Sequence, residues 1–290
     1  MDVGALLSGL LTGLREGVEA ALIVSIICAY LAKTGNRQAF PTIFWGTGLA
    51  IGASALLGVA LFVTVGSFEE PYEQLFEGAT MVLAAAVVTW MLFWMRRQAV
   101  SVKGELQQAV DRALDTGSTR ALGFLAFVAV IREGIETSLF LTGQVTSAEA
   151  GAGSVLVGAV IGLAVALLLG VGFYQGSRRL NLAVFFRWTG IALVFIAGGL
   201  LAHATHEFIE VGLIPFGTQT LFDLSGVLPH DPAAGNVLGQ ILRALFGYSA
   251  TPEVTTFAVW LVYVSVVLIL YLRPAPRLPA RPAPAVSSGV

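Results

Sequence analysis

Long apolar runs separated by short polar stretches dominate the chain. Seven of these runs reach about 20 residues, the length that a helix needs to cross the hydrocarbon core of a membrane. No stretch alternates between apolar and polar positions as a half-buried strand does. The pattern therefore predicts an all-α integral membrane protein with seven transmembrane helices. The expected spans are residues 3–30, 41–66, 72–95, 121–146, 154–175, 182–207 and 254–272.

Composition agrees with this fold class. The 290 residues are 56% hydrophobic and 12% charged, with a mean hydropathy of +0.83, whereas a soluble domain carries about 25% charged residues. A net charge of -2 gives no basis for nucleic-acid binding. The single cysteine, Cys28, excludes internal disulfides and a cysteine-based zinc site.

Basic residues gather in alternate loops. Most of the 16 lysines and arginines follow the first, third, fifth and seventh spans, while the opposite loops carry mainly aspartate and glutamate. Positive loop charge concentrates on the cytoplasmic side of a membrane. We therefore expect the N-terminus outside and the C-terminus in the cytoplasm.

One charged motif occurs twice. The first span reads Leu-Arg-Glu-Gly-Val-Glu from Leu14, and the fourth reads Ile-Arg-Glu-Gly-Ile-Glu from Ile131. The second and fifth spans share a GxxxG pair, at 48–52 and 158–162, which permits close helix contact. A three-span unit used twice in tandem acquires inverted topology, which is typical of transporters. The expected organisation is a permease domain over 1–272, comprising repeat 1 (1–95), repeat 2 (121–207), an extracytoplasmic loop (209–253) with a short interfacial helix (236–248) and a seventh helix (254–272), followed by a disordered cytoplasmic tail (273–290).

Each motif places three charges in the middle of a span. Ionisable groups there cost roughly 2.5–3.5 kcal/mol each on insertion scales, and they are rare unless functional. Because successive helical residues turn by about 100°, the arginine and both glutamates share one face. If the two faces meet, four carboxylates converge with two guanidinium groups and favour a hard multivalent cation. The candidate transport ligands are Glu16, Glu19, Glu133 and Glu136, with Arg15 and Arg132 positioning the carboxylates.

A second cluster of acids and histidines is expected where the third span begins and the sixth ends. Glutamates four residues apart repel unless a cation or proton lies between them, and histidine with glutamate at helical spacing can bind a transition metal. A solvated acidic rim explains the same residues equally well. This outer cluster consists of Glu73, Glu77, His203, His206, Glu207 and Glu210.

Other interpretations stay open at this point. The motif charges could be buried salt bridges that lock two helices together, although such pairs are weak evidence for stability. A membrane-embedded metallohydrolase could use His203, His206 and Glu207, but it leaves the doubled motif unexplained. Aromatic residues near span ends, such as Trp94, are interpreted as interfacial anchors, and Met81, Met91 and Met95 of the third span as lipid or packing contacts.

At the doubled motif the sequence resembles the oxidase-dependent iron transporter family, the Ftr/EfeU-type iron permeases, and its modest length resembles the bacterial branch. The resemblance covers nearly the whole chain. It implies high-affinity uptake of iron, as Fe²⁺ or Fe³⁺, by a multi-pass protein of the plasma (inner) membrane. Iron is then the substrate, no organic cofactor is expected, and a separate extracytoplasmic oxidase, peroxidase or iron-binding protein is the implied partner. A permease for Mn²⁺ or Pb²⁺ is the alternative within transport.

Overall fold

The computed structural model describes residues 2–65, 72–98, 102–115, 119–147, 151–175, 182–229 and 234–273. These residues form helices and loops, and among them the only strand-like feature is an isolated bridge between Thr220 and Glu253. The tail expected to be disordered lies outside the described residues after Arg273. The elements are α1 (Val3–Lys33), η1 (Arg37–Ala39), α2 (Phe40–Val65), α3 (Tyr72–Gln98), α4 (Val102–Asp115), α5 (Thr119–Ser147), α6 (Ala152–Tyr174), α7 (Leu182–Glu210), α8 (Val237–Phe246) and α9 (Val254–Leu272).

The helices confirm the expected class of an all-α integral membrane protein. Among the described residues, α2, α3, α6, α7 and α9 are long and apolar enough to cross a membrane. Helices α1 and α5 are as long, at 31 and 29 residues, and each carries the three charges of its motif. Every predicted span coincides with one of these helices to within a few residues.

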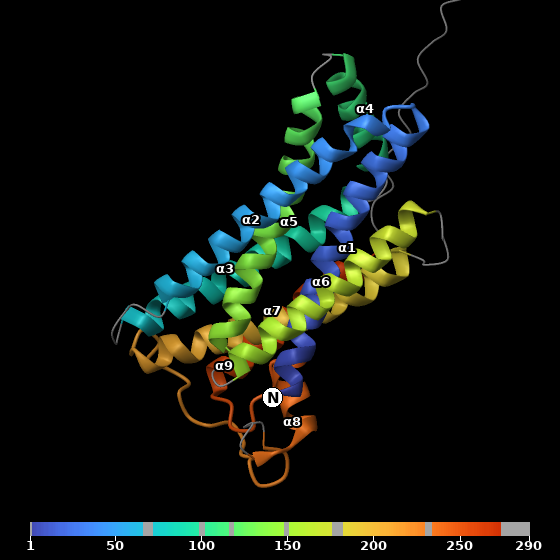
Figure 1. The fold of residues 1–290 in the computed structure, drawn as a ribbon. Helices are drawn as coiled ribbons and strands as arrows, with labels where there is room; N and C mark the ends of the chain where they lie inside the picture. The colour runs from blue at the N-terminus through green and yellow to red at the C-terminus, as the bar shows by residue number, and fades with distance from the viewer. Residues whose placement is uncertain are drawn as a thin grey trace, which may run out of the picture.

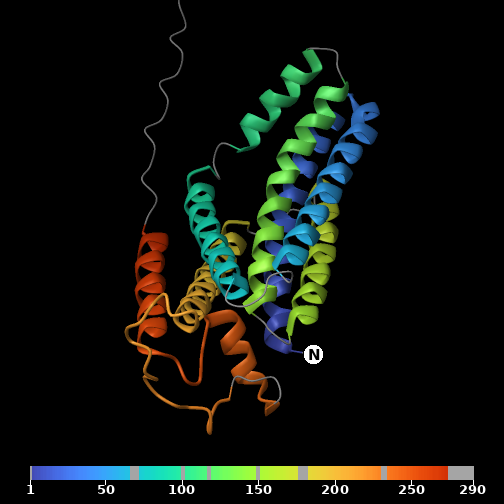
Figure 2. The ribbon, with the colours of Figure 1, turned by 90° about the vertical axis from the view of Figure 1, so that its left-hand side faces the viewer.

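The long helices form two groups that lie side by side (Figure 2). One group contains α1, α2, α5 and α6, and the other contains α3, α7 and α9. Helix α3 also packs against α5, so it joins the two groups. Helices α4 and α8 lie near opposite ends of the molecule (Figure 1).

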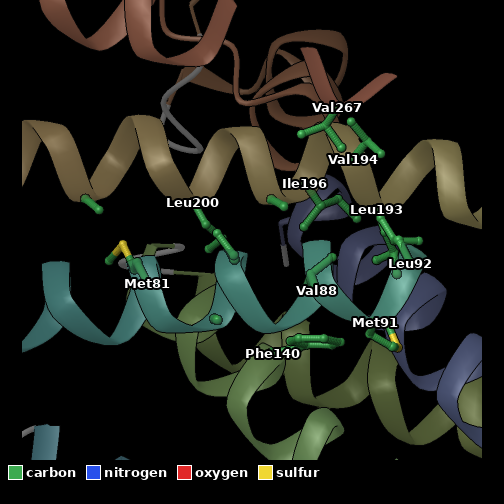
Figure 3. Packing of buried hydrophobic residues seen from close by; sticks show 14 of the residues in the cluster. Met81, Val88, Met91, Leu92, Phe140, Leu193, Val194, Ile196, Leu200 and Val267 are labelled. Carbon is green, nitrogen blue, oxygen red and sulfur yellow. The ribbon is translucent and has the colours of Figure 1, made fainter. Parts of the chain in front are cut away.

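The core of the second group is mainly apolar. Met81, Val88 and Leu92 of α3 pack against Leu193 and Leu200 of α7, as Figure 3 shows. Phe140 of α5 and Val267 of α9 close the same cluster. Burial of these side chains fixes where α3 stands relative to α5, which matters for the site below.

Close helix contacts in the first group depend on glycine and other small residues. A side chain added at Gly158 or Gly162 of α6 would overlap the α1 backbone, so the GxxxG prediction is confirmed for α6. It is wrong for α2, because a side chain at Gly48 or Gly52 would meet no atom within 4 Å. Helix α2 instead approaches α5 at Gly46, which faces the backbone of Gly123.

Two shorter helices complete the fold. Helix α4 is amphipathic and buries Val110 and Ala113 against the ends of α1 and α5; the sequence analysis had treated this stretch as a loop. Helix α8 falls within the predicted 236–248 segment. Asn236 caps its N-terminus, and the Asn236 side chain accepts a hydrogen bond from the backbone amide of Gly239. It docks on α1, where Val3 donates its amide to the buried Gln240 side chain.

Candidate metal centre

The two motif helices run antiparallel and bring the motifs to the same level. Ala5 near the start of α1 packs with Val145 near the end of α5, and Leu31 packs with Leu122 at the other end. Between these contacts, the Gln144 side chain donates a 2.7 Å hydrogen bond to the Thr12 hydroxyl. Because the helices are aligned in this way, the two motifs meet midway along them.

Each arginine is paired with both glutamates of its own motif. Arg15 Nη1 lies 2.6 Å from Glu16 Oε1, and Arg15 Nη2 lies 3.3 Å from Glu19 Oε1. In the second motif, Arg132 Nη2 lies 2.8 Å from Glu133 Oε1 and its Nε lies 3.5 Å from an oxygen of Glu136. Each arginine thus contacts the glutamates of its own helix, and its positioning role stays a prediction.

The glutamates form the tightest group of metal-binding side chains in the described part of the chain. Ligand atoms of Glu16, Glu19 and Glu133 all lie within 4.8 Å of one another, and the three residues are buried. Glu136 is also buried, at 4% exposure, although it is not a member of this triplet. Carboxylate oxygen is the ligand that hard cations prefer.

Each of the four glutamates keeps one carboxylate oxygen without a hydrogen bond. These oxygens are Glu16 Oε2, Glu19 Oε1, Glu133 Oε2 and Glu136 Oε2, of which Glu19 Oε1 still lies within ion-pair distance of Arg15. A buried polar atom left without a partner costs about 1–3 kcal/mol, and more when it is charged. The arrangement therefore suits a bound cation better than a set of salt bridges that satisfy themselves.

Helix α3 contributes a face that the sequence analysis did not assign to the site. Arg15 donates to the sulfur of Met91 at 3.1 Å and to that of Met95 at 3.2 Å. The guanidinium of Arg132 lies over the ring of Trp94, 4.1 Å from its centroid. Met91 and Met95 are therefore more than lipid or packing contacts, and Trp94 holds an arginine. Their i, i+3, i+4 spacing places the three side chains on one face, but spacing alone does not reveal what that face meets.

The outer cluster lies at the end of α7 and is only partly assembled. His203 Nε2 lies 3.6 Å from Glu207, and His206 Nε2 lies 3.5 Å from Glu210, as the predicted helical face requires. Glu77 is close enough to Glu207 and Glu73 for their charges to interact. Within the described residues, this cluster does not bring three ligand atoms as close together as the motif glutamates do.

Glu253 joins the outer cluster from a distant part of the sequence. Its Oε1 lies 2.7 Å from His206 Nδ1, and its Oε2 accepts a 2.8 Å hydrogen bond from Thr256. Partial burial acts to raise the pKa of Glu253, but the hydrogen bond from Thr256 and the contact with His206 outweigh it, so the pKa lies below its ordinary value. Glu253 therefore supplies negative charge next to His206 at neutral pH.

Two cavities reach toward the motif helices from different sides. A cavity of about 660 Å³ lies at the outer cluster, between α1, α5, α7, α8 and α9. Its polar lining includes Asp2, Ser8, Gln144, His203 and Glu253. A second cavity of about 830 Å³, between α1, α2, α5 and α6, is mainly apolar and is bordered by Glu16 and Glu133.

Long apolar helices around a buried group of carboxylates are typical of a membrane protein that binds or transports cations. The iron permease FTR1 family matches residues 6–275. The chain is 40% identical over 265 residues to the ferrous iron permease EfeU of Escherichia coli O6:H1, covering 90% of this chain and 93% of the relative. It is 38% identical over 262 residues to the ferrous iron permease EfeU of Yersinia pestis, covering 90% and 91%. No solved structure matches the chain.

The chain belongs to the iron permease FTR1 family. It is a multi-pass membrane protein and a transporter, with iron as the transported substrate, and not an enzyme. The metallohydrolase alternative is therefore wrong.

Proposed function

We propose that the chain imports iron across the plasma (inner) membrane through the site formed by the two motifs. The observation that carries this proposal is the buried group of Glu16, Glu19 and Glu133, whose ligand atoms lie within 4.8 Å of one another. Glu136 completes the carboxylate set, and Arg15 and Arg132 neutralise part of its charge while no ion is bound. Iron enters such a site as a hard cation that replaces water with carboxylate oxygen.

Seven spans in an inverted three-plus-three arrangement are part of the proposal. The packing supports it, because α1 runs along α6 in the same direction, with Gly9 beside Val155 and Gly170 beside Ala21. Helix α5 runs along α2 in the corresponding way, with Gly134 beside Ser54. If α1 is exchanged with α5, and α2 with α6, the α1–α6 pair becomes the α5–α2 pair. In inverted-repeat transporters the substrate binds at the interface between repeats, which is where α1 meets α5.

The proposed import uses the orientation that the basic loops predict, with the N-terminus outside. The outer cluster of Glu73, Glu77, His203, His206, Glu207 and Glu210, extended by Glu253, then faces the extracytoplasmic side. We propose that iron first binds there and moves inward to the motif glutamates. A rearrangement of the two repeats releases it toward the basic cytoplasmic side.

The proposed ion is ferrous iron, because the two relatives described above are named as ferrous iron permeases. Carboxylates accept Fe³⁺ as readily, and a separate extracytoplasmic oxidase, peroxidase or iron-binding protein would supply that form. Mn²⁺ and Pb²⁺ are the competing substrates. Uptake by reconstituted vesicles, with iron held reduced by ascorbate or oxidised as a ferric chelate, separates these cases, and excess Mn²⁺ or Pb²⁺ tests competition.

The proposal is tested by the double substitution Glu19→Ala/Glu136→Ala. We expect the variant to reach the membrane and to lose iron uptake by about 100-fold or more, because two of four carboxylate ligands are gone. Glu105→Ala on α4, which removes a carboxylate outside the site, is the matched control and should transport normally. Wild-type uptake by the double variant would contradict the proposed path.

A further inference from the structure

Gln144 lies near the end of α5, where it lines the 660 Å³ cavity, and it is an unusual side chain to bury between apolar helices. It is 4% exposed, and its amide nitrogen donates a 2.7 Å hydrogen bond to Thr12, which is fully buried. Its carbonyl oxygen, Oε1, is buried and has no hydrogen-bond partner among the described residues. Because the nitrogen is held by Thr12, the amide is fixed with its oxygen unpaired.

Buried side-chain oxygens without a hydrogen bond are few among the described residues, and most of them belong to the motif glutamates. In the described chain, the side-chain oxygens that are buried without a hydrogen bond belong to the four motif glutamates, to Gln144 and to Thr47. Native proteins leave few such atoms, and each requires an explanation. For the glutamates the proposed explanation is the transported cation, and the same explanation extends to Gln144.

The position of Gln144 links the outer cavity to the motif site. The lining of the 660 Å³ cavity ends at Ser8 on α1 and reaches Gln144 on α5. At 1.5 Å per residue, Thr12 lies about 6 Å along α1 from Glu16, and Gln144 lies about 12 Å along α5 from Glu136. The Thr12–Gln144 pair therefore stands between the cavity and the carboxylates.

The pair is polar in only one copy of the doubled motif. When the two motifs are aligned, Ile27 of α1 is the position equivalent to Gln144 of α5, and Ala129 of α5 is the position equivalent to Thr12 of α1. Ile27 is fully buried and packs in an apolar cluster with Leu122 and Ala126. Helix packing of this kind thus works with apolar residues at both positions, and the polar pair needs a reason other than packing.

We propose that Gln144 is an iron ligand at a transfer site between the outer cavity and the motif glutamates, and that Thr12 orients it. This inference rests on the proposed function. A cation leaving His203 and Glu253 in the cavity binds the free carbonyl oxygen of Gln144 before it reaches the first carboxylate. An uncharged amide oxygen suits a transfer site, because it replaces a water ligand without holding the ion as strongly as a carboxylate does.

The decisive experiment compares Thr12→Val/Gln144→Leu with the wild-type chain in reconstituted vesicles, using Fe²⁺ under ascorbate. Replacing both partners of a buried hydrogen bond by apolar groups of similar shape is nearly neutral for stability. We therefore expect an unchanged unfolding temperature in detergent together with a KM for iron raised by about tenfold or more. A variant with wild-type KM and maximal rate would overturn the proposal.

A single substitution provides a second, independent test. Gln144→Glu keeps the acceptor oxygen and adds charge, so we expect a lower KM together with a lower maximal rate, since the ion leaves a carboxylate more slowly. A structural role for Gln144 predicts no decrease in KM, and an unchanged KM would contradict the assignment. Thr146→Val is the matched control, because the Thr146 hydroxyl bonds carbonyls of its own helix, and its kinetics should stay at wild-type values.

The two proposals fail in distinguishable ways. If Glu19→Ala/Glu136→Ala still imports iron, the motif path is wrong, and the transfer site is lost with it. If that variant is inactive while Thr12→Val/Gln144→Leu transports normally, the motif path stands and the role assigned to Gln144 is wrong.

Discussion

The motif on α1 and the motif on α5 have the same charged residues but different surroundings. The Arg15 side chain is 2% exposed and donates to two methionine sulfurs, whereas the Arg132 side chain is 37% exposed and lies over Trp94. Both sets of contacts come from α3. The two motifs therefore carry the same carboxylates, and the contacts with α3 give the two arginines different surroundings.

The antiparallel helices give this difference a direction. In each motif the arginine precedes its glutamates, so along the helix axes the two arginines stand on opposite sides of the carboxylate group. The buried Arg15 stands on the side where Thr12 and Gln144 lie, and the partly exposed Arg132 stands on the other side. Under the proposed orientation, Arg15 lies on the outer side of the carboxylates and Arg132 on the cytoplasmic side.

The largest test of this difference removes each arginine. Arg15→Gln leaves two buried glutamates without a partner, and we expect it to destabilise the protein by about 3–5 kcal/mol and to abolish uptake. Arg132→Gln also removes the partner of two buried glutamates, but the Arg132 side chain is itself partly exposed and water can replace part of the contact, so we expect a smaller loss than for Arg15→Gln. Unfolding temperatures in detergent measure both, with the exposed Arg112→Gln on α4 as control. Equal losses at the two motifs would remove the distinction between them.

A second test addresses the motif glycines, which contact different helices. A side chain at Gly17 would overlap Ala166 of α6, and one at Gly134 would overlap Ser54 of α2. We expect Gly134→Ala to cost about 1–3 kcal/mol through overpacking. Adding Ser54→Gly should restore part of that loss.

Gly48→Ala on α2 is the matched control for the glycine test. A side chain there meets nothing within 4 Å, so the substitution should be neutral or should stabilise the helix by up to about 1 kcal/mol. Thermal unfolding of the three variants checks the set. A rescue by Ser54→Gly that failed completely would show that Gly134 acts through something other than this contact.

A smaller effect is expected at the methionines that hold Arg15. Met91→Leu/Met95→Leu keeps the apolar volume, so the stability loss should stay near 1 kcal/mol, but the arginine loses both sulfur acceptors. We expect uptake to fall while the protein remains folded. Met81→Leu, a buried methionine on the same helix that packs only in the apolar core, should leave uptake unchanged. Equal uptake in the two variants would reduce Met91 and Met95 to packing.

The smallest expected effect concerns Trp94. Trp94→Leu removes the ring beneath Arg132, an interaction that contributes about 0.5–1 kcal/mol at a partly exposed site. Trp94→Phe should retain part of this stabilisation because a ring remains. Unfolding temperatures measure both variants, and an equal loss in Trp94→Leu and Trp94→Phe would exclude the ring contact as the cause.

The long helices and the approach of the two motifs could be predicted from the sequence for a physical reason. An apolar run that crosses a membrane must satisfy its own backbone hydrogen bonds, so it forms a helix, and charges inside such a run stand out at once. The motif glutamates were identified in this way, and Glu16, Glu19 and Glu133 do come together.

The parts that were missed depend on how helices pack against one another. Local patterns do not say that Met91 and Trp94 face the two arginines, or that Glu253 reaches His206 across the outer loop. The GxxxG pair of α2 was misassigned because such a spacing does not indicate which face meets a neighbour. Helix α4 was missed because its apolar stripe is short and lies among charged residues.

The pairing of each arginine within its own helix has a consequence for how the protein is made. During synthesis α1 reaches the membrane long before α5 exists, and an unpaired arginine or glutamate at mid-membrane costs roughly 2.5–3.5 kcal/mol on insertion scales. Arg15 contacts both glutamates of α1, and Arg132 contacts both glutamates of α5. Each helix thus enters the bilayer with its arginine already paired to its own glutamates, and it can be inserted before the other motif helix is present. The permease assembles its charged centre from two segments that are each tolerable to the insertion machinery alone.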